Sequence, residues 1–129
     1  MHENWRFKMK KKRRRFPSDE ILFLSKEYFN SINNRNFAEA DRIIDKIKNT
    51  STKSDRLNGF LSALEGMRLS IYTNEKYAFI VQLPTVQKDV QKLKKDFNKK
   101  IRNPLSTNFD KGFFTAWLEY IEYYAKTLQ

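Results

Sequence analysis

Lysines and arginines near the N-terminus are the most prominent functional groups of the sequence. The stretch RFKMKKKRRRF, residues 6–16, places eight cationic side chains in eleven positions. Cations that neutralise phosphates release condensed counterions, and aromatic rings among them can stack on unpaired bases. We predict that this head binds nucleic acid through Trp5, Arg6, Phe7, Lys8, Lys10, Lys11, Lys12, Arg13, Arg14, Arg15 and Phe16.

A second basic group follows the spacing of a helix predicted over residues 85–101. Its apolar residues recur at i, i+4, i+7, i+11 and i+15, and a set of cations keeps nearly the same rhythm two residues later. Two residues are about 200° of rotation, so the cations should face away from the buried side. The apolar residues are Val86, Val90, Leu93, Phe97 and Ile101. The cations, called here the lysine ridge, are Lys88, Lys92, Lys95, Lys99 and Arg102.

The positive charge is concentrated in these two segments. The net charge of the chain is +11, of which residues 1–17 carry +7 and residues 88–102 carry +5, leaving −1 for the rest. Like charges repel one another, and solubility alone would be served by mixed charges spread over the surface. A polyanionic partner explains this placement more simply.

Catalytic and metal-binding chemistry is disfavoured. The chain has no cysteine, and its one histidine is His2. Asp41 and Asp45 have cations beside them, which favours surface ion pairs over acid and base roles. Glu119 and Glu122 lack the histidine partners of a bundle metal site. We expect a protein that is not an enzyme and has no cofactor, metal or small-molecule substrate.

The expected location is the cytoplasm. A chain without cysteine suits a reducing compartment. Its longest apolar runs, residues 21–24 and 78–81, are far below the roughly 18 residues of a membrane span, and no apolar segment of a secretory signal follows the basic head.

The sequence predicts that these basic residues are carried by a helical protein. Helical periodicity and the capping residues Ser18, Ser54 and Thr107 predict an all-α bundle of about five to six helices, the first two forming a hairpin. Residues 1–17 are expected to be an extended basic tail and residues 18–129 a single helical domain. The expected helices cover residues 18–32, 37–48, 54–73, 74–83 and 85–101, with a last helix after Thr107.

Small and aromatic residues predict close packing. Gly59, Ala63, Gly66 and Ser70 fall on one face of the third helix, where another helix or a bulky ring should approach closely. The last helix carries seven of the nineteen aromatic residues, which favours core packing with one or two tyrosines outside.

Two segments resemble a family of small, uncharacterised helical proteins of archaea. The family shows a Leu-Glu-Gly-Met segment, here residues 64–67, and an Asp-basic-Gly-Phe-Phe segment, here residues 110–114. The resemblance spans roughly residues 57–124, leaves out the basic head and carries no catalytic signature. It implies an archaeal cytoplasmic protein and, with the charge, makes association with the ribosome plausible.

Three functions fit these observations. The leading prediction is an RNA-binding structural protein, ribosomal or ribosome-associated, that contacts ribosomal RNA and neighbouring ribosomal proteins. The alternatives are a helical adaptor for protein partners with a basic localisation tail, and a chromatin protein that binds DNA without sequence preference. The ridge alone could be a solvated helix face, and the tail alone an address signal or an electrostatic membrane anchor.

Overall fold

The structure of the protein is a computed structural model that describes residues 16–50 and 52–128. Within these two ranges it contains five α-helices and no strand, which confirms the prediction of an all-α protein. The helices are α2 (Asp19–Asn33), α3 (Phe37–Thr50), α4 (Asp55–Tyr72), α5 (Gln87–Arg102) and α6 (Asn108–Thr127).

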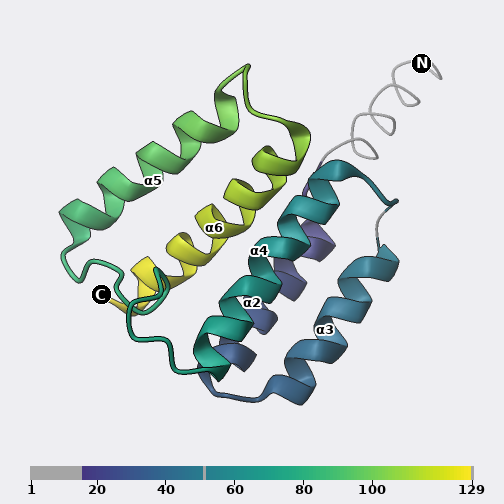
Figure 1. The fold of residues 1–129 in the computed structure, drawn as a ribbon, viewed down its shortest axis with the longest axis horizontal. Helices are drawn as coiled ribbons and strands as arrows, with labels where there is room; N and C mark the ends of the chain where they lie inside the picture. The colour runs from purple at the N-terminus through teal and green to yellow at the C-terminus, as the bar shows by residue number, and fades with distance from the viewer. Residues whose placement is uncertain (1–15, 51, 129) are drawn as a thin grey trace, which may run out of the picture.

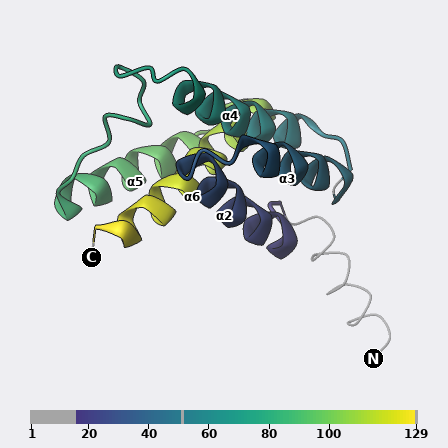
Figure 2. The same ribbon diagram turned by 90° about the horizontal axis from the view of Figure 1, so that it is seen from below.

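The helices pack around α6 and α4. Figure 1 shows α4 and α6 running in the same direction in the middle of the molecule, with α3 at one edge and α5 at the other. From below, α2 lies across the side of the molecule opposite to α3 and α4 (Figure 2). The predicted hairpin is present, because α2 packs against α3. The partner helix of α5 is α6, so α5 forms an outer layer with one side open.

Three of the helices begin at the predicted capping residues. The hydroxyl oxygens of Ser18, Ser54 and Thr107 accept hydrogen bonds from the backbone N–H groups of the third residue after each, at 3.1–3.2 Å. Each cap satisfies one of the free amide groups of a helix start, which stabilises a helix by about 1 kcal/mol. The same three helices carry an acidic residue in the first turn, where the helix dipole favours negative charge.

The closest helix contact is the crossing of α4 and α6, where a glycine of each helix meets the backbone of the other. A Cβ atom at Gly59 would overlap the carbonyl group of Phe109 and lie 3.0 Å from the amide nitrogen of Phe113. A Cβ atom at Gly112 would overlap the carbonyl group of Arg56 in the same way. The predicted close approach to the third helix is therefore confirmed at Gly59, whereas Gly66 is exposed and faces open space.

The core has a main part and a smaller outer part. In the main part Tyr28 and Phe29 of α2 are fully buried, and the Tyr28 hydroxyl donates a 2.6 Å hydrogen bond to the Leu64 carbonyl of α4. The outer cluster joins α5 to α6 and consists of Val90, Phe97, Ile121 and Ala125. The aromatic residues of α6 pack in both parts, which confirms the predicted core packing, but the exposed ring among them is Phe109 and not a tyrosine.

The predicted helix over residues 74–83 is wrong, because α5 is the next helix after α4. The segment folds instead as a series of turns, with amide-to-carbonyl bonds from Ala78 to Glu75 and from Val81 to Ala78. Asn74 has a φ of 55°, a left-handed conformation that ends the preceding helix. In Figure 2 this connection loops out beyond α5 on the side of α4.

The start of the fifth predicted helix also needs correction. The sequence placed it at residue 85 with Val86 in the apolar face, but the helix begins at Gln87 and Val86 is the residue before it. Its side chain is 56% exposed. Val86 has extended backbone angles and no side-chain oxygen for a cap, so its side chain lies outside the helical register.

Candidate nucleic-acid interface

The lysine ridge forms the solvent face of α5. Its five residues are all exposed, whereas Val90 and Phe97 on the opposite face are buried and Leu93 is half-buried. The predicted opposition of an apolar and a cationic face is thus present in the structure. From Lys88 to Arg102 the ridge is about 21 Å long at a rise of 1.5 Å per residue.

The helix itself tolerates this concentration of cations at its end. Lys99, Lys100 and Arg102 lie in the last turn, where the negative end of the helix dipole favours positive charge. The single acidic residue of the first turn, Asp89, lies at the opposite end. The helix dipole therefore stabilises the cations at the C-terminal end of the ridge. The other cations of the ridge are available to interact with solvent or with a partner.

Among the described residues, none of the cations of α5 has a carboxylate partner, whereas Arg42, Lys48 and Arg68 of α3 and α4 each have one. No cation of α5 lies within 4.0 Å of an acidic oxygen of the described chain. All three ion pairs of the described chain involve α3 and α4. They are Arg42 with Glu39, Lys48 with Glu65 at 3.8 Å, and Arg68 with Asp41 at 2.9 Å. The ridge is consequently a region of uncompensated positive charge.

A hollow of about 410 Å³ adjoins the ridge. Its lining combines apolar and charged side chains from α5 with one ring from the connection between α4 and α5. The lining residues are Phe79, Leu93, Asp96, Phe97, Lys99 and Lys100. The Nζ atom of Lys100 also lies 5.0 Å from the ring centre of Phe114. The sequence does not predict this hollow, because its pattern indicates a helix around Phe79 and nothing local places that ring beside Phe97.

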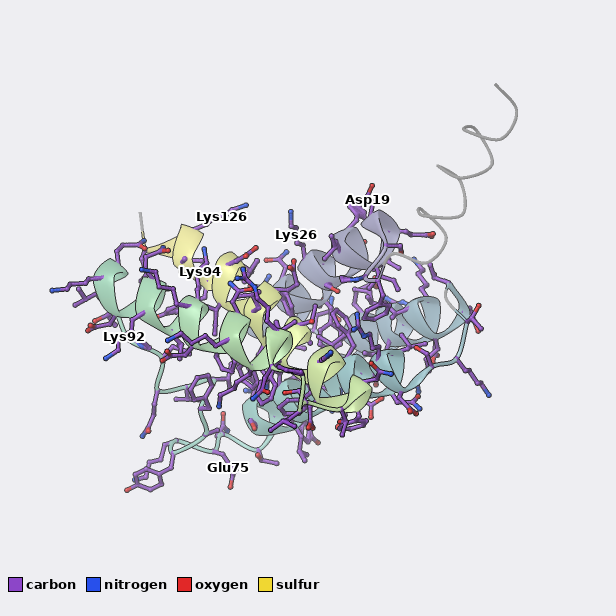
Figure 3. All side chains as sticks on the ribbon, turned by 90° about the horizontal axis from the view of Figure 1, so that it is seen from above. Asp19, Lys26, Glu75, Lys92, Lys94 and Lys126 are labelled. Atoms are coloured by element: carbon purple, nitrogen blue, oxygen red, sulfur yellow. The ribbon has the colours of Figure 1, made fainter. Side chains whose placement is uncertain are left out.

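Two further lysines line a groove between α2 and α6. Lys26 and Lys126 line it together with Glu119 and Glu122, and in Figure 3 both lysines point to the same side of the molecule as Lys94. Burial, and then the neighbouring Glu122, raise the pKa of Glu119. The charges in this groove are mixed, so it does not extend the uncompensated surface of the ridge. The sequence alone could not predict this groove, because its lining residues belong to α2 and α6, which are far apart in the chain.

The basic head lies outside the described residues except for Phe16. The ring of Phe16 is half-buried and meets the ring of Phe60 edge-on, with 5.5 Å between the ring centres. Phe16 thus packs on the main core, a role that the sequence did not indicate, and it is left out of the interface proposed below. The prediction for residues 5–15 stays a prediction.

The carboxylates of the described residues form ion pairs with cations or occur outside any cluster that could hold a metal ion. Asp41 pairs with Arg68 of the neighbouring helix, and Glu65 pairs with Lys48. In the part of the chain that the structure describes, no group of three or more His, Cys, Asp or Glu residues could hold a metal ion. Over the same part, no helix is long and apolar enough to cross a membrane.

Comparisons with models of protein families, with curated proteins and with solved structures found no match. The resemblance to archaeal helical proteins therefore stays a prediction. Three of the residues that carry it have packing roles here. Leu64 and Met67 are buried in the main core, and Gly112 lies at the crossing of α4 and α6. Function must be inferred from the chemistry of the ridge.

Proposed function

We propose that this protein binds structured RNA, as a ribosomal or ribosome-associated protein, and that the lysine ridge of α5 contacts the phosphate backbone. The observation that carries the proposal is the exposed row of five cations without a carboxylate partner. A helix face that only kept the protein soluble would be served by mixed charges, such as those on α3, which has three acidic and three basic residues.

The composition of the ridge favours phosphate contacts over the reading of bases. Four of its five members are lysines, which act as point charges on flexible stems. Contacts to phosphates fix the position of a protein on a nucleic acid and carry no sequence information. Lysine and arginine can contact guanine in a DNA groove, but the ridge contains no Asn or Gln, the side chains that pair with adenine. This supports a structural role over sequence-specific DNA binding.

Replacing ridge charges tests the proposal. The triple variant Lys92→Glu, Lys95→Glu, Lys99→Glu should bind a folded RNA more weakly and with a smaller dependence on salt. The logarithm of the affinity changes by about 0.7 to 0.9 per decade of salt for each phosphate contact. We expect a clear fall of that slope in a salt titration followed by fluorescence anisotropy. The same titration with duplex DNA decides between the RNA-binding and chromatin alternatives.

A matched control separates the ridge from net charge. Lys46, Lys53 and Lys76 are exposed and do not belong to α5, and changing all three to Glu alters the net charge by the same amount. This control should keep most of the affinity. Equal losses in the two triple variants would show that only overall charge matters and would contradict the proposed interface. Sedimentation of cell extract at low and high salt tests the association with ribosomes.

A further inference from the structure

The hollow beside the lysine ridge has an aromatic wall that is held in place from two sides. The ring of Phe79 meets Trp117 at 5.0 Å and Phe97 at 6.0 Å between ring centres, both nearly perpendicular. Perpendicular ring pairs of this kind are favourable arrangements. Phe79 is nevertheless 45% exposed, so a large ring is fixed with much of its surface open to the solvent.

The charges around the hollow indicate which class of molecule could enter it. Lys99 belongs both to the ridge and to the lining, and Lys100 lies next to it. A molecule that places a flat apolar group against Phe79 and an anion near Lys99 would satisfy both features. A nucleotide has this combination, because every base has a π face and is joined to a phosphate.

Asp96 adds a preference among the four bases. It lines the hollow, is exposed, and has no ion-pair partner among the described residues. A carboxylate accepts hydrogen bonds through two oxygens. Guanine presents two adjacent donors on its Watson–Crick edge, N1–H and the N2 amino group, whereas adenine, cytosine and uracil each present one group of donors there. An unpaired guanine is therefore the base that Asp96 fits best.

We propose that the hollow binds one unpaired guanosine of the RNA that the lysine ridge holds. The base stacks against Phe79, its donor edge faces Asp96, and the adjoining phosphate contacts Lys99. This inference rests on the proposed function and deepens it, since unpaired bases in loops and bulges are the usual targets of base recognition in RNA. The ridge supplies affinity and the hollow supplies the choice of position along the strand.

The test compares two short single-stranded oligoribonucleotides of equal length, one of uridines only and one with a central guanosine. Their backbone charges are equal, so a difference in affinity reports on the base. Wild type should bind the guanosine oligonucleotide more tightly by about tenfold, the scale of one good paired contact to a base. Photocrosslinking with 6-thioguanosine at the central position should label the peptide that contains Phe79 or the one that contains Phe97.

Two variants and one control locate the effect. Phe79→Leu keeps an apolar side chain against Trp117 but removes the stacking face, and it should lower the affinity for the guanosine oligonucleotide about tenfold. Asp96→Ala should weaken binding of the guanosine oligonucleotide and strengthen binding of the uridine one, because a negative charge next to the ridge is removed. Tyr77→Ala alters an aromatic residue of the same connection that is 80% exposed, and it should change neither affinity.

The outcomes separate this inference from the proposed function. If wild type binds both oligonucleotides equally, or if Phe79→Leu and Asp96→Ala keep the preference while the ridge triple variant loses affinity, the guanosine site is wrong and the RNA-binding ridge stands. If wild type binds the folded RNA of the salt titration but neither oligonucleotide, the guanosine site alone is wrong. If it binds none of the three RNAs, both proposals are wrong. Opposite changes of the two affinities in Asp96→Ala, with an unchanged thermal unfolding midpoint, would support the site.

Discussion

Gly59 and Gly66 lie on the same helix, yet a methyl group should have opposite effects at the two positions. At Gly59 the added carbon would overlap the Phe109 carbonyl, a backbone group that only a shift of α6 could move. At Gly66 nothing lies within 4 Å. Gly59→Ala should therefore destabilise the fold by about 3 kcal/mol or more, as overpacking against a rigid neighbour does. Gly66→Ala should stabilise it by about 0.5–1 kcal/mol, because alanine loses less backbone entropy in a helix.

Urea unfolding of the two variants checks this pair. Gly66→Ala serves as the control for the effect of helix propensity alone, since both substitutions are in α4. A loss of stability below about 1 kcal/mol in Gly59→Ala would mean that the two helices can separate slightly, and that their crossing does not fix the position of α6.

Glu119 should make the fold less stable as the pH rises. Burial, followed by repulsion from Glu122, raises the pKa of Glu119 in the folded protein, although Lys26 and Lys126 act in the opposite direction. A carboxyl group with a raised pKa favours folding while it is protonated. As the pH rises from the unfolded pKa of about 4.5 through the raised value, the unfolded chain releases its proton first, so that this contribution is lost.

Glu119→Gln should remove this dependence. Relative to wild type, the variant should gain free energy of unfolding between pH 4 and pH 7, as measured by urea titrations at several pH values. Glu75→Gln, at an exposed position of the connection between α4 and α5, is the matched control for the loss of one carboxyl group. A gain for Glu119→Gln that does not change with pH would point to packing or helix propensity as its cause.

At the scale of elements, the end of α4 is fixed by a residue far away in the chain. Arg35, in the turn between α2 and α3, donates to the carbonyl of Ile71 at 2.9 Å, to that of Tyr72 at 3.4 Å and to the side-chain oxygen of Asn74 at 3.2 Å. The last carbonyls of a helix lack partners within the helix, and a cation is favourable at that end. Arg35 thus joins the turn of the first hairpin to the C-terminus of α4.

Removing this side chain should loosen the connection that follows α4. Arg35→Ala should lower the stability by about 1 kcal/mol, the size of a charge-assisted bond reduced by exposure to solvent, and should speed amide hydrogen exchange in residues 73–82. Alanine keeps the strain of the left-handed backbone at this position, where φ is 58°, so the change isolates the side chain. Arg42→Ala, which removes an exposed pair within α3, should cost less than about 0.5 kcal/mol and leave the exchange of residues 73–82 unchanged.

The elements that the sequence predicted correctly are those whose signals are local. Ser18, Ser54 and Thr107 mark helix starts, and the structure has the cap bonds at these residues. The failure at residues 74–83 has a tertiary cause. Ile80 and Leu83 are buried, as a helical pattern would require, but they belong to a series of turns. The turns follow Asn74, whose side chain accepts a hydrogen bond from Arg35. A contact across more than thirty residues leaves no signal in the local periodicity.

At the scale of the whole molecule, the same limit applies to the candidate site. The ridge could be predicted because all five residues belong to one helix with a regular period. The hollow could not, because its wall joins Phe79 from the connection to Leu93 and Phe97 of α5. The absence of acidic partners around the ridge was also not a property of the sequence, since Asp89 and Asp96 are close enough along the helix to pair with lysines and do not do so here.

Among the described residues the three ion pairs lie on α3 and α4, and no cation of α5 belongs to an ion pair. If the basic head also binds the same RNA, head and ridge should act as two attachment points. Deleting residues 1–15 and changing the ridge to glutamates should then each lower the salt slope of RNA binding, and the two reductions should add in the combined variant, because each set of phosphate contacts releases its own counterions. Salt titrations of the four proteins with one folded RNA measure this.

An adaptor whose tail only localises it would bind its protein partner unchanged after the deletion. A ridge effect that disappears once the head is removed would show that α5 only assists the head and does not contact phosphates itself.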